Sequence, residues 1–359
     1  MSETNPSPGP DFGPRRISVE LTNICNLHCS YCLRDDDALY HTPANFIAPE
    51  FLQSLVSQAR DVMSITSLIF TGGEPTLHPQ FARMLEIAAE NELKCSFVTN
   101  GWHFERVWPA IIKHRNSIAA VAFSLDGATR EEHDRWRGDG SFTRLARALS
   151  LCFMSGVPFN IKVGIRRDTL PALERIAVFA ARMGASALSF GHVMPTSMEV
   201  EDASALSLEE RAQAEREIAT LSRIFKMKIG IDVGYYNVDE SSPCSALAGV
   251  SCNVDYLGRL SLCCNLSGFR GAVGEGDVVA DLHTESFASA YTRLARVASE
   301  QLDARRARLA MFAEQGIAPD LHTGGPCLFC LNTLGKLPWN QPLTSAAAAN
   351  RSLPVLPQT

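Results

Sequence analysis

The chain has 359 residues, of which 46% are apolar, and a formal net charge of −6. It is long enough for two domains, while its acidic balance argues against a nucleic-acid substrate, which a basic surface would bind. No run reaches the roughly 18 apolar residues that cross a membrane, and the polar, Pro-rich start lacks the apolar region of a secretory signal. We therefore expect a cytoplasmic protein that contacts neither membrane nor nucleic acid.

Short apolar runs alternate with helical patterns from residue 17 to about 225. Strands are predicted at 17–21, 66–71, 94–99, 119–125, 158–165 and 186–191. Helices are predicted at 50–63, 79–92, 104–114, 141–155, 170–183 and 207–225. Strand–helix units in a row predict an α/β fold with a parallel sheet or barrel. The pattern alone does not separate a barrel from a doubly wound sheet.

The composition changes after residue 230, where Gly, Ser and Cys become frequent. A hairpin is predicted around Gly258, from 253–257 and 259–262, and helical patterns return at 284–300 and 303–315. We therefore divide the chain into a disordered tail at 1–16, an α/β domain at 17–230, a cysteine-rich domain at 231–340 and a loose C-terminal tail at 341–359.

Three cysteines lie in one loop after the first predicted strand. Cys25, Cys29 and Cys32 have the spacing C-x3-C-x2-C. Three thiolates on a tight loop can hold three irons of a cubic iron–sulfur cluster, which leaves the fourth iron open for chemistry, as at other open metal sites. The alternative is a zinc site with His28 or His41 as fourth ligand, although structural zinc loops usually come as two pairs of ligands.

This loop, with Tyr31 before its third cysteine, resembles the signature of the radical S-adenosylmethionine (radical SAM) enzymes. The resemblance implies that Cys25, Cys29 and Cys32 hold a [4Fe–4S] cluster whose open iron binds SAM. It also implies that the reduced cluster cleaves SAM to a 5′-deoxyadenosyl radical, which takes a hydrogen atom from the substrate. A partial (β/α)6 barrel and an electron donor such as flavodoxin or ferredoxin are implied as well.

A second match to this family follows the second predicted strand, at Gly72, Gly73 and Glu74. Ligands of parallel α/β folds gather at the carboxyl ends of strands. Glycines there let backbone approach a ligand closely, and Glu74 can accept hydrogen bonds from an ammonium group. The triplet matches the Gly-Gly-Glu motif, which in the family binds the amino group of SAM. Residues 99–101 end the third strand at the same edge.

Later strand ends supply further candidates for this pocket. Ser124 and Asp126 end the fourth strand and resemble the family's Ser-x-Asp segment beside SAM, with an ordinary Asx turn as the alternative. Lys162 and Arg166 on the fifth strand could pair with the SAM carboxylate, although most such residues lie at the surface. His192, after the sixth strand, could face the substrate or be structural. Asp126 and His192 are the candidate catalytic residues.

A second group of cysteines follows residue 240. Cys244 and Cys263 flank the predicted hairpin, and Cys327 and Cys330 form a later C-x2-C pair. With Gly258 they resemble the auxiliary-cluster extension called SPASM, in its shorter twitch form. The resemblance implies a small C-terminal extension with one auxiliary [4Fe–4S] cluster on these four thiolates. A zinc ion on the same thiolates is the alternative.

Two surplus cysteines leave this ligand set open. Cys252 could replace Cys244, and Cys264 could replace Cys263. Four thiolates favour a fully ligated cluster that accepts electrons, and hence a net two-electron oxidation of the substrate. We expect a radical SAM oxidoreductase acting on a small natural-product metabolite, because no N-terminal domain that would hold a leader peptide is evident.

Two alternatives to this function stay open. One is a radical SAM peptide maturase that makes a crosslink, a thioether or an epimer. The other, from a different class, is a zinc-stabilised binding protein without catalysis. A peptide groove should be long and open, whereas a small-molecule pocket should be closed and lined by polar groups.

Overall fold

The structure is a computed structural model that describes residues 15–196, 205–239, 241 and 243–337. The C-terminal tail predicted at 341–359 lies outside the described residues, as does all but the end of the tail predicted at 1–16. Arg16 is already the first residue of a strand. No helix among the described residues is long and apolar enough to cross a membrane.

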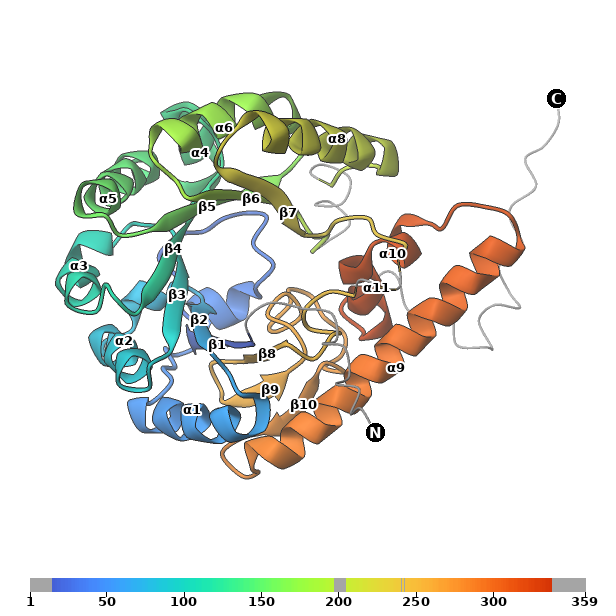
Figure 1. The fold of residues 1–359 in the computed structure, drawn as a ribbon, viewed down its shortest axis with the longest axis horizontal. Coiled ribbons are helices and arrows are strands. Elements are labelled where there is room, and N and C mark those ends of the chain that lie inside the picture. The colour runs from blue at the N-terminus through green and yellow to red at the C-terminus, as the bar shows by residue number, and fades with distance from the viewer. Residues whose placement is uncertain (1–14, 197–204, 240, 242, 338–359) are drawn as a thin grey trace, which may run out of the picture.

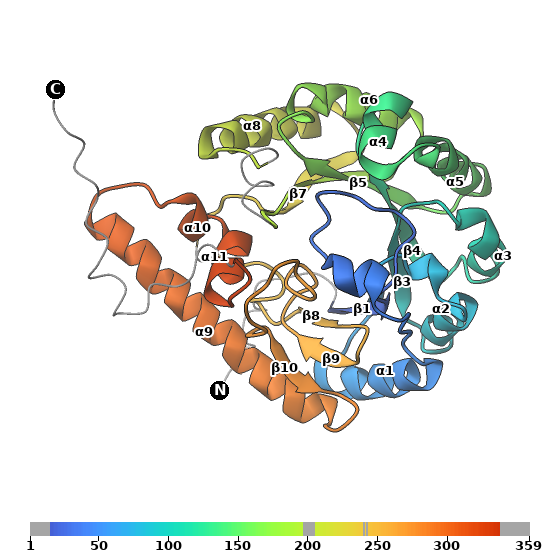
Figure 2. The same cartoon turned by 180° about the vertical axis from the view of Figure 1, so that it is seen from behind.

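One curved sheet runs through the described chain (Figures 1 and 2), with the strand order β10-β9-β8-β1-β2-β3-β4-β5-β6-β7. The strands are β1 (Arg16–Thr22), β2 (Ser67–Gly72), β3 (Lys94–Thr99), β4 (Ile118–Leu125), β5 (Phe159–Ile165), β6 (Ala187–His192), β7 (Lys228–Val233), β8 (Ser251–Val254), β9 (Arg259–Ser261) and β10 (Val278–Asp281). Strand β8 and strands β1 to β7 pair in parallel. Strand β9 pairs antiparallel with β8 and β10.

Helices cover the convex side of the sheet, and α9 crosses beside β8 to β10 (Figure 1). The outer layer consists of α1 (Pro49–Met63), α2 (Phe81–Glu90), α3 (Phe104–Lys113), α4 (Arg130–Arg137), α5 (Ser141–Ser155), α6 (Leu173–Arg182) and α8 (Leu208–Ile224). Helix α9 (Phe287–Glu314) is followed by the short helices α10 (Leu321–Gly324) and α11 (Pro326–Thr333), which lie beside it (Figures 1 and 2). The predicted α/β class and its parallel strands are confirmed. The order is that of an open curved sheet with edges at β10 and β7.

Alternation along the strands separates the core from the concave side. Phe97 and Phe123 face the helices, where their rings lie 5.2 Å from Phe81 of α2 and 5.0 Å from Phe104 of α3, centroid to centroid. Because side chains alternate between the faces of a strand, the next residues along, such as Ser124, face the concave side. The core therefore lies between sheet and helices, and the small and polar residues line the inner surface.

Strand β7 and helix α9 differ from the predictions, whereas the hairpin agrees with them. Strand β7 was not predicted, because its sequence is short, contains a glycine and is half exposed. Helix α9 is one helix where two were predicted, since no Gly or Pro interrupts it. The predicted hairpin is confirmed as β8 and β9, and Gly258 turns it with a φ of +78°.

Candidate functional site

The loop with Cys25 is held by the end of strand β2. The backbone N–H of Gly73 donates to the carbonyl of Thr22 at 2.9 Å, and the N–H of Glu74 donates to the carbonyl of Ile24 at 2.8 Å. A Cβ atom on Gly73 would lie 2.0 Å from the Ile24 oxygen. The glycine of this motif is therefore needed where two protein segments touch, and not only where a ligand approaches.

The three predicted cluster cysteines, Cys25, Cys29 and Cys32, line one cavity of about 160 Å³. Burial raises the pKa of Cys25 to about 12 and raises the pKa of Cys29. Buried thiols of this kind lose their protons when they bind a metal, because the thiolate is the ligand. Gly73, Glu74, Asn100, Ser124 and Arg137 are among the other lining residues.

Glu74 is buried and bound to the neighbouring strand end. Its Oε1 accepts hydrogen bonds from the hydroxyls of Thr76 at 2.5 Å and Thr99 at 2.7 Å, and its Oε2 accepts from the backbone N–H of Asn100 at 2.8 Å. Burial raises the pKa of this carboxyl. Since a carboxylate has about four acceptor sites, Oε2 retains capacity for one more donor.

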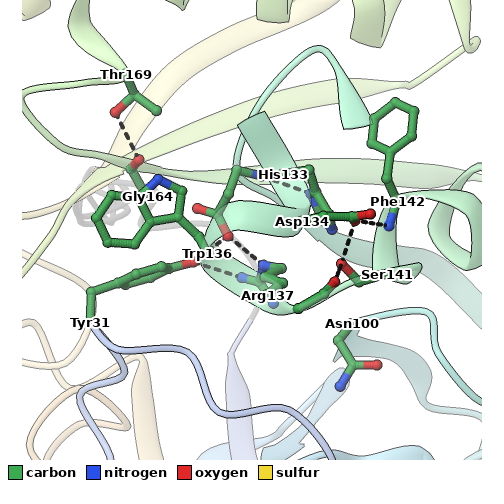
Figure 3. A network of polar contacts seen from close by, with 12 residues as sticks. Tyr31, Asn100, His133, Asp134, Trp136, Arg137, Ser141, Phe142, Gly164 and Thr169 are labelled. Carbon is green, nitrogen blue, oxygen red and sulfur yellow. Dashed lines mark hydrogen bonds and ion pairs between the residues drawn. The ribbon is translucent and has the colours of Figure 1, made fainter. Parts of the chain in front are cut away.

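A charged network beside this cavity includes Tyr31 and Arg137 (Figure 3), and Asp126 holds it together. It accepts hydrogen bonds from Arg166 Nη1 at 2.7 Å, from Arg137 and from the Tyr31 hydroxyl. Although burial alone would raise it, the pKa of Asp126 lies well below its usual range because of Arg137 and Arg166. A general base works best with a pKa near the operating pH, so this carboxylate is suited to positioning the arginines.

Arg137 is a site residue that the sequence predictions missed. It is the last residue of α4, it lines the cysteine cavity, and its Nη2 donates to the Tyr31 hydroxyl at 2.9 Å. Arg166, by contrast, is buried with its guanidinium 4.2 Å from the ring centroid of Trp136, and it lines no described cavity near the cysteines. The capping box of Thr129 and Glu132 could have revealed α4 from the sequence.

A second cavity, of about 210 Å³, adjoins the first and shares Tyr31, Ser124 and Arg137 with it. Lys162 lines this second cavity and pairs with Asp232 of β7. The predicted SAM-binding residues therefore divide. Gly73 and Glu74 line the cysteine cavity, Tyr31 and Ser124 line both cavities, Lys162 lines the second, and Gly72, Asp126 and Arg166 line neither.

His192 borders the second cavity, but its imidazole lies on the helix side of the sheet. It pairs in register with Ile165, which is a core residue. Its Nε2 is 3.7 Å from Glu215 of α8, too far for a hydrogen bond. Burial lowers the pKa of His192 and Glu215 opposes that shift, so the place between β6 and α8 disfavours the charged ring.

A third cavity is lined almost entirely by apolar side chains and thiols. Its thiols are those of Cys244, Cys263, Cys327 and Cys330, the four that were predicted as auxiliary ligands. Burial raises the pKa of Cys327 to about 12. Met194 and Asn265 line both this third cavity and the second.

The two surplus cysteines lie elsewhere. Cys252 is buried on β8, with its sulfur 3.9 Å from that of Met63 in the core. Cys264 does not line the third cavity, and a hydrogen bond with Cys263 lowers its pKa. Over the part of the chain that the structure describes, no three His, Cys, Asp or Glu side chains converge as a single metal ion requires.

The two kinds of metal group make different demands on these thiols. One zinc ion needs its ligands gathered at about 2.3 Å from a single point, and the described residues include no group of three or more His, Cys, Asp or Glu side chains placed to hold a metal ion. A cubic cluster instead takes one thiolate for each iron, around a body of several atoms. Thiols that surround a cavity, with apolar neighbours at the third one, match that requirement.

Comparisons with known proteins agree with this geometry. Residues 19–180 match the family model described as the radical SAM superfamily. The mycofactocin maturase MftC of Mycobacterium tuberculosis is 32% identical over 181 residues, which are 48% of this chain and 43% of that protein. The AdoMet-dependent heme synthase of Nitratidesulfovibrio vulgaris is 28% identical over 186 residues, 50% of this chain and 48% of that protein.

A solved structure shows the same fold at lower identity. Streptococcus suis SuiB bound to the precursor peptide SuiA superposes with a TM-score of 0.62 and 12% identity, over 77% of this chain and 64% of that one. The similarity to MftC and to the heme synthase spans less than half the length of either protein.

Proposed function

We propose that the chain is a member of the radical SAM superfamily, whose family model matches residues 19–180, and that Cys25, Cys29 and Cys32 hold its [4Fe–4S] cluster, with SAM in the same cavity. The observation that carries this proposal is the shared cavity, which the three thiols line together with Glu74 and Arg137. When bound, cluster and SAM supply a 5′-deoxyadenosyl radical that takes a hydrogen atom from the substrate.

The residues that line this cavity match the two charged groups of the methionine part of SAM. Glu74 Oε2 and the nearby Asn100 side chain offer acceptors for the ammonium group of SAM. Arg137 offers a guanidinium for its carboxylate, a pairing that is often bidentate. Because Asp126 fixes Arg137 in place, we assign the carboxylate to Arg137 in preference to Lys162 or Arg166. This assignment revises the expectation from the sequence.

We further propose that Cys244, Cys263, Cys327 and Cys330 hold one auxiliary [4Fe–4S] cluster. Their shared apolar cavity supports this, and the place of Cys252 in the core argues against its being a ligand. The second cavity lies between the two cysteine cavities and shares lining residues with each. A substrate there would adjoin both, which suits an oxidation whose electron leaves to the auxiliary site.

A peptide is the substrate class that we favour. MftC is named a maturase, and SuiB is described as bound to a precursor peptide. This support moves the proposal from the small metabolite expected from the sequence to the alternative of a peptide maturase. A small molecule stays the second candidate, because a heme synthase is similar over a comparable stretch. The flavodoxin or ferredoxin donor and the cytoplasmic location remain predictions.

Anaerobic reconstitution with iron and sulfide tests the proposal. We expect about eight irons per chain, as two cubic clusters require, and 5′-deoxyadenosine after reduction in the presence of SAM. Cys29→Ala should abolish 5′-deoxyadenosine, Cys327→Ala should lose about half of the iron, and Cys252→Ala is the matched control that keeps both. Formation of 5′-deoxyadenosine by the Cys29 variant would refute the site. Incubation with peptide and small-molecule candidates then separates the substrate classes.

A further inference from the structure

The segments that follow the two cysteine groups are joined to each other. After Cys32, the N–H of Asp35 donates to the carbonyl of Gly268 at 2.9 Å, and the N–H of Arg270 donates to the carbonyl of Leu33 at 2.8 Å. Arg34 and Phe269 form an antiparallel β-bridge between these bonds. The first cysteine loop is thus tied to the loop that follows Cys263, although more than 200 residues separate them in sequence.

The side chain of Arg34 is fixed on both sides of this junction. Its Nη2 pairs with Glu20 at 2.8 Å, and its Nη1 donates to the carbonyl of Ser267. Glu20 is 1% exposed, and its Oε1 also accepts from Asn253 Nδ2 at 3.1 Å. The guanidinium is therefore held by strand β1 and by the second cysteine loop, while its own backbone belongs to the first.

The guanidinium is bound next to backbone segments of both cysteine groups. Arg34 follows Cys32 by two residues, and Ser267, whose carbonyl the guanidinium binds, donates its own N–H to the carbonyl of Cys263 at 3.3 Å. An arginine side chain remains charged throughout the working range of proteins. A buried charge also acts over a longer distance than an exposed one, because solvent screens it less.

We propose that Arg34 is a positioning residue whose fixed charge is shared by the two cysteine sites and favours the reduced state of the cluster at each. The proposal rests on the function given above. One electron that arrives at either cluster adds one negative charge and makes or breaks no bond. A nearby cation stabilises that added charge, and charge near the cluster is one of the factors that set its reduction potential. Glu20 offsets part of the effect.

A substitution at the neighbouring Arg270 serves as a control, because Arg270 also holds the two segments together. Its Nη1 donates to the carbonyl of Ser30 at 3.2 Å, its Nε donates to that of Arg34 at 3.3 Å, and it pairs with Asp36. It therefore joins the same two segments, but at a more exposed place where water screens the charge. Arg270→Gln loosens the junction and removes a charge whose side chain is 22% exposed, whereas Arg34→Gln removes one whose side chain is 11% exposed.

The experiment is a redox titration of the reconstituted full chain, followed by the EPR signals of its clusters and paired with iron counting. We expect Arg34→Gln to lower both reduction potentials, Arg34→Lys to stay close to the unsubstituted chain, and Arg270→Gln to shift neither. Glu20→Gln should raise the potentials, because it removes the charge that offsets Arg34. Its opposite sign cannot come from a loosened junction.

Several results would overturn the inference. Unchanged potentials in Arg34→Gln with both clusters loaded would do so, and so would an equal shift in Arg270→Gln. If Arg34→Gln does not retain its clusters, the Glu20→Gln variant is the deciding test. Reduction potentials that are unchanged or lowered in Glu20→Gln would then refute the proposal. Failure of the unsubstituted chain to take up about eight irons would instead count against the proposed function.

Discussion

Gly73→Ala should release the first cysteine loop. The added Cβ would lie 2.0 Å from the Ile24 carbonyl oxygen and 2.6 Å from that of Asn23, while ordinary contact for a Cβ begins at 3.4 Å. Both neighbours are backbone atoms, so no side chain can rotate to make room. Strand end and loop must therefore separate by roughly 1.4 Å at the closest contact.

That separation breaks the two backbone hydrogen bonds that join Gly73 to Thr22 and Glu74 to Ile24. A hydrogen bond contributes a net free energy of about 1 kcal/mol, so we expect the free energy of unfolding of the cofactor-free chain to fall by about 2 kcal/mol. Because the loop carries three ligands, we also expect the loss of about four of eight irons and of 5′-deoxyadenosine formation.

Urea unfolding of the cofactor-free chain and iron counting after reconstitution measure the two effects. Gly230→Ala is the matched control, because no atom lies within 4 Å of its added Cβ and its φ is not in the left-handed region. It should keep both the stability and the iron. If Gly73→Ala retained the stability and eight irons, the contact between strand end and loop would not be what holds the cysteines.

Three further predictions concern the charged network and the surplus thiol. Asp126→Asn leaves Arg137 and Arg166 without their buried anion, so the free energy of unfolding at pH 7, measured in urea, should fall by about 3–5 kcal/mol. The folded pKa of Asp126 is depressed, so the stabilisation by its carboxylate is present above the unfolded pKa of about 4 and is lost as pH falls below it. Urea titrations at pH 7 and pH 3 should therefore show a smaller fall in the free energy of unfolding for Asp126→Asn than for the unsubstituted chain. An equal fall in both would contradict the pairing. Cys264→Ala should retain about eight irons by iron counting, whereas a loss of half would make it a ligand.

Much of the fold follows from local patterns in the sequence. Apolar runs of β-branched and aromatic residues mark β1 to β6, since each is buried on the helix side. The alternation of these runs with amphipathic helices then indicates the parallel order. The half-exposed β7 lacks such a run, and its edge position depends on pairing with β6, which no local pattern encodes.

Part of the candidate site depends on contacts between distant segments. The motifs identify Cys25, Cys29 and Cys32 because three like residues within one loop need no tertiary information to be close. The sequence does not decide whether Cys252 or Cys244 is the auxiliary ligand. The pairing of β8 with β1 shows that Cys252 packs in the core. Arg137 was missed for a similar reason, since a helix end and not a strand end brings it to the cavity.

The order of the three cavities gives the proposed chemistry a direction. Arg137 and Ser124 separate the first cavity from the second, and Met194 and Asn265 separate the second from the third. In the proposed chemistry a hydrogen atom would leave the substrate toward the first cavity, and an electron would leave it toward the third. The junction of Arg34 with Glu20 and Ser267 joins the two cysteine loops. The separation of the two cysteine cavities therefore depends on contacts outside the second cavity, so a substrate need not itself hold the two sites apart.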